Sequence, residues 1–100
     1  MNLSGFSDYC ETPEVGATGK GPSYENGIRY LCNYLGIDTQ NISANDLKLI
    51  KSNEVFLRTR GSTFYDKFLS YLEKQHRTSY LTRGFIRAAL PYFYKFCNFR

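Results

Sequence analysis

The C-terminal part of the chain decides the fold, and residues 79–97 read SYLTRGFIRAALPYFYKFC. Large apolar side chains return there every three or four positions, which is the period of an α-helix with one buried face. Pro91 lies inside this pattern. Because proline removes a helix hydrogen bond and crowds the preceding turn, we expect a kink or a break near residues 88–90. The predicted apolar face comprises Leu81, Phe85, Ile86, Ala89, Leu90, Phe93, Phe96 and Cys97.

A second helix is predicted over residues 24–35. Ser23 is the expected N-cap, and Pro22 is expected to stop the helix from extending backward. Gly36 is the expected left-handed terminator, with the apolar Ile37 folding back over the last turn. The residues that share the apolar face are Tyr24, Ile28, Leu31, Cys32 and Leu35.

Two further helices are predicted over residues 44–57 and 63–75. Ser43 followed by Asp46 is an acidic variant of the capping box, which marks a helix start. An irregular stretch is expected after residues 52–53, and Ser62 begins the next helix after a glycine. No segment alternates apolar and polar residues over a useful length, so the predicted fold class is all-α, a small four-helix bundle.

The first part of the chain has a different composition, since residues 1–22 hold four glycines, two prolines and three acids. A segment with so few large aliphatic residues is expected to be flexible, with residues 23–100 forming the helical domain. Phe6 and Tyr9 are its residues that could dock on that domain. The glycines of residues 16–21 lack the spacing of a phosphate-binding loop.

Positive charge is concentrated at the other end of the chain. Residues 58–100 hold nine Lys and Arg against two acids, a net charge of +7, whereas the whole chain carries +4. Such an asymmetric distribution of charge creates an electrostatic field that attracts a polyanion to one part of the molecule. Nucleic acid is the natural candidate, because contacts with its phosphates release counterions.

Composition excludes several other classes of protein. No apolar run approaches the roughly 20 residues that span a bilayer, and the N-terminus lacks the basic start and apolar stretch of a signal peptide. The three cysteines, Cys10, Cys32 and Cys97, have no close pairs, which argues against a disulfide framework and against a zinc site. We expect a reduced cytoplasmic protein without a metal, a cofactor or contact with a membrane.

The inventory of catalytic residues is small. His76 is the only histidine and falls in a predicted polar turn, where a solvated side chain is more common than a general base. Asp66 and Glu73 are expected to form surface ion pairs with the neighbouring lysines of their helix. The sequence therefore predicts a protein that is not an enzyme.

Two short motifs carry a resemblance to a known family. Residues 68–72 read FLSYL and residues 78–82 read TSYLT, followed by the spaced run Phe85, Ala89, Leu90, Phe93 and Phe96. In this order they resemble the core-binding domain of phage integrases and other tyrosine recombinases, a small SAM-like helical bundle. Gly84 and Pro91 fall where that family keeps an unbroken helix. The chain has no counterpart of the recombinase catalytic domain, so the resemblance implies DNA gripping without strand exchange.

The candidate nucleic-acid site lies on the polar side of the last helix. We expect Arg83 and Arg87, one turn apart, to face solvent together and to contact phosphates. Arginines mixed with tyrosines suit phosphate contact combined with hydrogen bonding or stacking. Thr78, Ser79 and Tyr80 at the helix start are expected to add donors to a phosphate, and Arg58 and Arg60, just before Gly61, are expected to form the opposite rim. The complete predicted site is Arg58, Arg60, Arg77, Thr78, Ser79, Tyr80, Arg83, Arg87 and Tyr94.

The leading hypothesis from the sequence is a non-catalytic module that binds duplex DNA. Such a module is either a compact small protein or the targeting domain of a larger nuclease or recombinase, whose catalytic domain would then be its partner. The alternative is a protein-interaction module, for example a phage or mobile-element regulator that binds a host protein. It is kept open because 17% of the residues are Phe or Tyr, and protein interfaces favour such residues.

Overall fold

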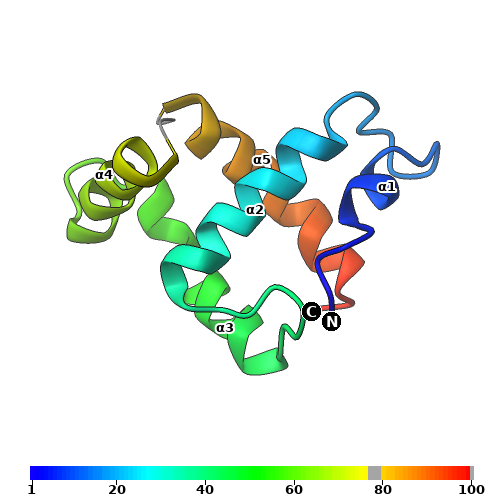
Figure 1. The fold of residues 1–100 in the computed structure, drawn as a ribbon, viewed down its shortest axis with the longest axis horizontal. Coiled ribbons are helices and arrows are strands. Elements are labelled where there is room, and N and C mark those ends of the chain that lie inside the picture. The colour runs from blue at the N-terminus through cyan, green and yellow to red at the C-terminus, as the bar shows by residue number, and fades with distance from the viewer. Residues whose placement is uncertain (77–79, 100) are drawn as a thin grey trace.

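The computed structural model describes residues 1–76 and 80–99 of the chain. Every regular element in these ranges is helical, so the all-α prediction is confirmed. Figure 1 shows α2 and α5 crossing at the centre of the molecule, with α1 at one end, α4 at the other and α3 below them. The elements are α1 (Phe6–Cys10), α2 (Gly21–Leu35), α3 (Ala44–Asn53), the 3-10 helix η1 (Glu54–Leu57), α4 (Thr63–His76) and α5 (Tyr80–Phe96).

The start of α2 differs from the prediction, while its end agrees. The helix begins at Gly21 and holds Pro22 in its first turn. Proline is tolerated there because the first amides of a helix have no partner within it, so Pro22 does not stop the helix and Ser23 is not its cap. Gly36 has a φ of 75°, and the amide of Ile37 donates to the carbonyl of Cys32 at 2.8 Å. This bond closes the last turn as predicted.

The predicted capping box of α3 is confirmed. The Ser43 amide donates to the Asp46 carboxylate at 2.9 Å, and the Asp46 amide donates to the Ser43 hydroxyl at 3.1 Å. The irregular stretch expected after residues 52–53 is the 3-10 helix η1. The chain then turns into α4, where the Ser62 hydroxyl accepts from the amide of Tyr65 at 3.1 Å.

The last helix, α5, does not break at proline. It runs through Pro91, and its central residues Ile86, Ala89, Leu90 and Phe93 are buried. Phe85, which we placed on the buried face, is 36% exposed. At about 100° per residue it lies roughly a quarter-turn from the centre of that face, at the edge of the contact with α2.

The prediction that residues 1–22 form a flexible segment is wrong. Leu3, Phe6 and Cys10 are completely buried, and the Phe6 ring packs at 5.5 Å from the ring of Phe93. The Leu3 amide also donates to the carbonyl of Thr39 at 2.8 Å. The segment folds because its few apolar residues are spaced three and four apart and meet the aromatic surface of α5, although its average composition is poor in apolar groups.

Candidate nucleic-acid interface

Only part of the predicted site falls on residues that the structure describes. Arg58 and Arg60 are exposed in the loop between η1 and α4. Arg77, predicted as part of the positive surface, and Thr78 and Ser79, predicted as donors at the start of the last helix, lie outside the described residues. Tyr80 and Arg83 belong to α5, but their side chains are likewise outside the described part.

Tyr94 does not belong to an exposed site. Its side chain is 8% exposed, and its ring lies 5.5 Å from that of Phe99. The ammonium of Lys51 also lies 4.9 Å from the centroid of the Tyr94 ring, a cation–π contact. Burial, with a smaller effect from Glu54, raises the pKa of Tyr94. The prediction failed because α3 and η1 cover a second side of α5, which a single apolar stripe does not reveal.

Arg87, which was predicted to face solvent, is only partly exposed. Its side chain is half-buried, and its Nε is buried without a hydrogen-bond partner in the described part of the chain. Arg87 lies seven residues before Tyr94, so both occupy one side of α5. A guanidinium keeps its charge and is weakly hydrated, so this partly covered group remains suited to an anion.

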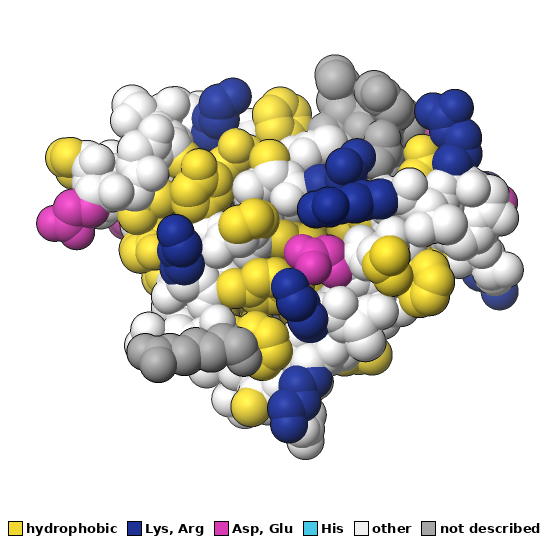
Figure 2. All heavy atoms as spheres, turned by 180° about the vertical axis from the view of Figure 1, so that it is seen from behind, with side chains coloured by type: hydrophobic (Ala, Val, Ile, Leu, Met, Phe, Trp, Pro, Cys, Tyr) yellow, Lys and Arg dark blue, Asp and Glu magenta, His cyan; other side chains and the backbone are white. Residues whose placement is uncertain are grey.

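The other cations that the structure describes after residue 57 are exposed and make no ion pair with the described residues. In the described ranges, the ion pairs are Arg29 with Glu25 at 3.3 Å and Lys51 with Glu54 at 3.1 Å, both before residue 58. The ion pairs expected for the acids of α4 are not formed among the described residues. Figure 2 shows Lys and Arg side chains dispersed among hydrophobic ones on the face behind α2. Among the described residues after position 57, the exposed cations without a carboxylate within 4.0 Å are Arg58, Arg60, Lys67, Lys74 and Lys95.

Sequence reasoning did not single out three of these cations. Lys67 and Lys74 entered the predictions as lysines of a helix with acids to pair with, and Lys95 entered only through the net charge, because their spacing matches no motif. Whether these lysines are free to contact a phosphate depends on where the acidic side chains lie in space. That arrangement follows from the tertiary fold, and counting charges along the sequence does not give it.

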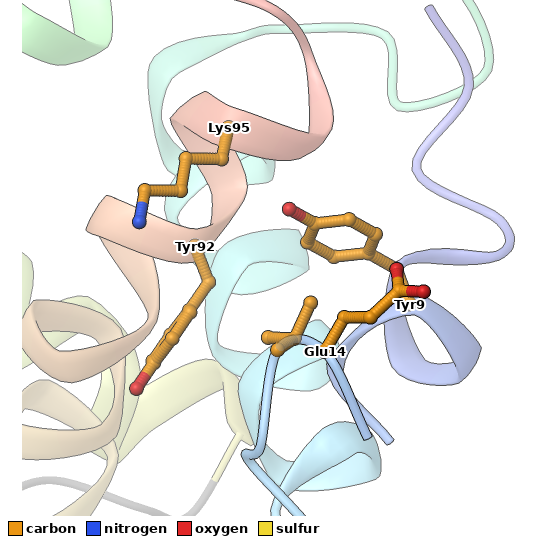
Figure 3. Close-up of a pocket in the computed structure, with 5 residues that line it drawn as sticks. Tyr9, Glu14, Tyr92 and Lys95 are labelled. Atoms are coloured by element: carbon orange, nitrogen blue, oxygen red, sulfur yellow. The ribbon is translucent and has the colours of Figure 1, made fainter. Parts of the chain in front are cut away.

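Sequence reasoning also missed a pocket of about 200 Å³ between the N-terminal segment and α5. Tyr9 of α1 and Tyr92 of α5 line it together with Val15, and Glu14 and Lys95 lie at its edge (Figure 3). Residues 1–22 were expected to be flexible, so no pocket with a wall from this segment was predicted.

The cysteines are poor nucleophiles in this structure. Burial raises the pKa of Cys32 to about 12 and those of Cys10 and Cys97 to about 11. Their thiols therefore stay protonated at neutral pH. Among the described residues, no group of three or more His, Cys, Asp and Glu side chains could hold a metal ion, and no helix is long and apolar enough to cross a membrane.

The buried Tyr94 hydroxyl leads to a prediction about stability. It has no hydrogen-bond partner among the described residues. Replacing Tyr94 with phenylalanine keeps the ring contacts and removes an unpaired polar group, so the free energy of unfolding should rise by about 1 kcal/mol. Urea denaturation followed by circular dichroism measures the change. A loss of about 1 kcal/mol or more would show that the hydroxyl makes a favourable contact.

No protein-family model matches this chain, and no curated protein or solved structure is significantly similar to it. The resemblance to the core-binding domain of tyrosine recombinases therefore rests on the two sequence motifs and the spaced aromatic run.

Proposed function

We propose that this chain is a non-catalytic DNA-binding module whose phosphate contacts come from the cations of residues 58–100. The observation that carries the proposal is that Arg58, Arg60 and the exposed lysines of α4 and α5 make no ion pair in the described part of the chain. The charge of a cation without a carboxylate partner is not compensated by the protein, so it attracts an external polyanion more strongly. Among the described residues, the cations held in ion pairs are Arg29 and Lys51, and both precede this segment. The described cations of residues 58–100, a segment with a net charge of +7, are therefore not compensated by ion pairs within the described part.

The physical basis of binding is the release of counterions from the DNA backbone. Each neutralised phosphate contributes a slope of about −0.9 to the dependence of log affinity on log salt for duplex DNA. Such contacts give affinity and orientation without reading the sequence of bases. Half-buried Arg87 adds a guanidinium whose terminal nitrogens can donate to a phosphate. The recombinase-like motifs also favour DNA binding. In this proposal the module acts in the cytoplasm and targets a separate catalytic domain to DNA.

The proposal is tested by a charge change that leaves the core untouched. We expect the Arg58→Gln/Arg60→Gln variant to bind random-sequence duplex DNA more weakly than the parent protein. The salt slope should become shallower by about 1.8, because two phosphate contacts are lost. Fluorescence anisotropy between about 50 and 200 mM salt measures both quantities.

The matched control is Lys20→Gln/Lys48→Gln, which removes the same charge from exposed positions before residue 58. This control should lower the affinity for duplex DNA less than Arg58→Gln/Arg60→Gln does. It should change the salt slope by less than the roughly 0.9 expected for one phosphate contact. If both double variants behave alike, the binding surface is not in residues 58–100. If the parent binds no nucleic acid at low salt, the proposed function is wrong.

A protein-interaction module is the second candidate, and one observation favours it. Leu49, Val55 and Phe56 are large apolar side chains on neighbouring turns of α3 and η1, and all are exposed, Val55 at 58%. Exposed apolar residues close together are typical of protein interfaces. Binding through this surface should depend weakly on salt, whereas DNA binding should weaken steeply, and this difference separates the two functions.

A further inference from the structure

The pocket between α1 and α5 has two aromatic walls held in fixed positions by other rings. The Tyr92 ring stacks on the ring of Tyr24, with the centroids 6.0 Å apart and the planes at 22°. The Tyr9 ring lies 6.4 Å from that of Phe6 and 5.3 Å from that of Phe96. Because these supporting rings belong to or border the core, the two walls are ordered before any ligand enters.

The edge of the pocket carries opposite charges. Figure 3 shows Lys95 on the α5 side and Glu14 on the side of the N-terminal segment, beside Tyr9. Neither side chain makes an ion pair in the described part of the chain. A ligand that complements this pocket therefore has a flat apolar ring, hydrogen-bond donors at one end and an anionic group at the other.

We infer that this pocket binds one unpaired nucleobase, with guanine preferred. The inference rests on the proposed function and adds a preference for a strand with unpaired bases. The pocket, at about 200 Å³, is smaller than the roughly 300–1,000 Å³ of sites for drug-sized molecules, so it suits a single ring system. The base stacks between Tyr9 and Tyr92, Lys95 contacts the phosphate attached to it, and Glu14 accepts from its edge.

The preference for guanine follows from the carboxylate. Guanine presents two adjacent N–H donors on its Watson–Crick edge, and a carboxylate can accept both. Adenine and cytosine present one amino group there. Thymine and uracil present a single N–H between two carbonyl oxygens, which repel Glu14. A base inside a duplex cannot enter, because stacking and pairing cover its faces and this edge.

The test compares single-stranded and duplex binding of one variant. Replacing Tyr92 with leucine keeps an apolar side chain against Tyr24 and removes one stacking face. We expect its affinity for an oligothymidine strand with one central guanosine to fall roughly 5- to 150-fold, which corresponds to about 1–3 kcal/mol per stacked base. Its affinity for duplex DNA should be unchanged. The matched control is Phe85→Leu. The Phe85 ring also packs against the ring of Tyr24, with the centroids 6.4 Å apart, but Phe85 does not line this pocket.

A second variant covers the case in which Tyr92→Leu does not fold. Glu14 is exposed, and Glu14→Gln leaves only one acceptor oxygen beside the base. The parent protein should bind the guanosine-containing strand more tightly than plain oligothymidine, and Glu14→Gln should reduce that ratio. An unchanged ratio, or equal losses for Tyr92→Leu and Phe85→Leu, would overturn the inference.

The outcomes separate this inference from the proposed function. If the parent binds duplex DNA in a salt-dependent way but gains nothing from unpaired guanine, the pocket assignment is wrong and the DNA-binding proposal stands. If it binds guanosine monophosphate in a Tyr92-dependent way but no polynucleotide, the ligand is a free nucleotide and the DNA-binding proposal is wrong. If it binds neither, both are wrong.

Discussion

Replacing Phe6 with alanine is expected to lower the free energy of unfolding by about 3–5 kcal/mol, the usual cost of removing a buried phenylalanine. Phe6 is completely buried, and its ring lies between 5.4 and 6.4 Å from those of Tyr9, Phe93 and Phe96. Truncation would leave a cavity where α1 meets α5. Urea denaturation followed by circular dichroism measures the loss.

The control for this prediction is Phe56→Ala. It removes the same atoms from a ring that is 39% exposed, so we expect it to cost less than about 1 kcal/mol. If Phe6→Ala were as mild as Phe56→Ala, the N-terminal segment would contribute little to the core, and our sequence-based expectation of a flexible segment would be right after all.

The contrast between Phe6 and the helices explains how far the sequence could predict the fold. Local signals such as the Ser43 and Asp46 capping box or the terminating Gly36 act within a few residues of each other, and the structure bears both out. The docking of Phe6 on α5 joins parts of the chain almost ninety positions apart. The aromatic Phe6 and Tyr9 were predicted as residues that could dock on the helical domain, and their ring contacts with α5 confirm this. No local pattern predicts which residues they meet, and the glycines of the segment, such as Gly5 with a φ of 93°, shape turns in this structure.

The candidate site could be predicted in its charge and not in its geometry. The excess of Lys and Arg after residue 57 is a property of the sequence. Whether each cation is free depends on the fold: Lys51 is held by Glu54 and lies over the ring of Tyr94, whereas Lys95 has no such partner among the described residues. Tyr94 was misplaced for the same reason, because its burial depends on the packing of α3 and η1 against α5.

The crossing of α2 and α5 predicts that replacing one glycine with alanine destabilises the protein, whereas replacing another stabilises it. Gly27 of α2 is buried, and a Cβ there would lie 2.9 Å from Cγ1 of Ile86, which is itself completely buried. Overpacking of a core costs roughly 1–3 kcal/mol, and alanine returns up to about 1 kcal/mol in helix propensity. Gly27→Ala should therefore lower the free energy of unfolding by up to about 2 kcal/mol.

Gly84 of α5 is the matched control, because it is exposed and no atom lies within 4 Å of a Cβ built there. Gly84→Ala should raise the free energy of unfolding by about 0.5–1 kcal/mol through helix propensity alone. A double-mutant cycle tests the cause: Ile86→Ala should cost less in the Gly27→Ala background than in the parent protein, because it removes the atom that the new methyl group meets. Equal costs in both backgrounds, or stabilisation by Gly27→Ala, would show that the helices do not meet at this glycine.

The close approach of α2 and α5 matters for the pocket as well, since the packing of these helices brings Tyr24 under the ring of Tyr92. A variant that forces these helices apart should weaken the binding of unpaired bases along with stability, whereas Gly84→Ala should leave it unchanged.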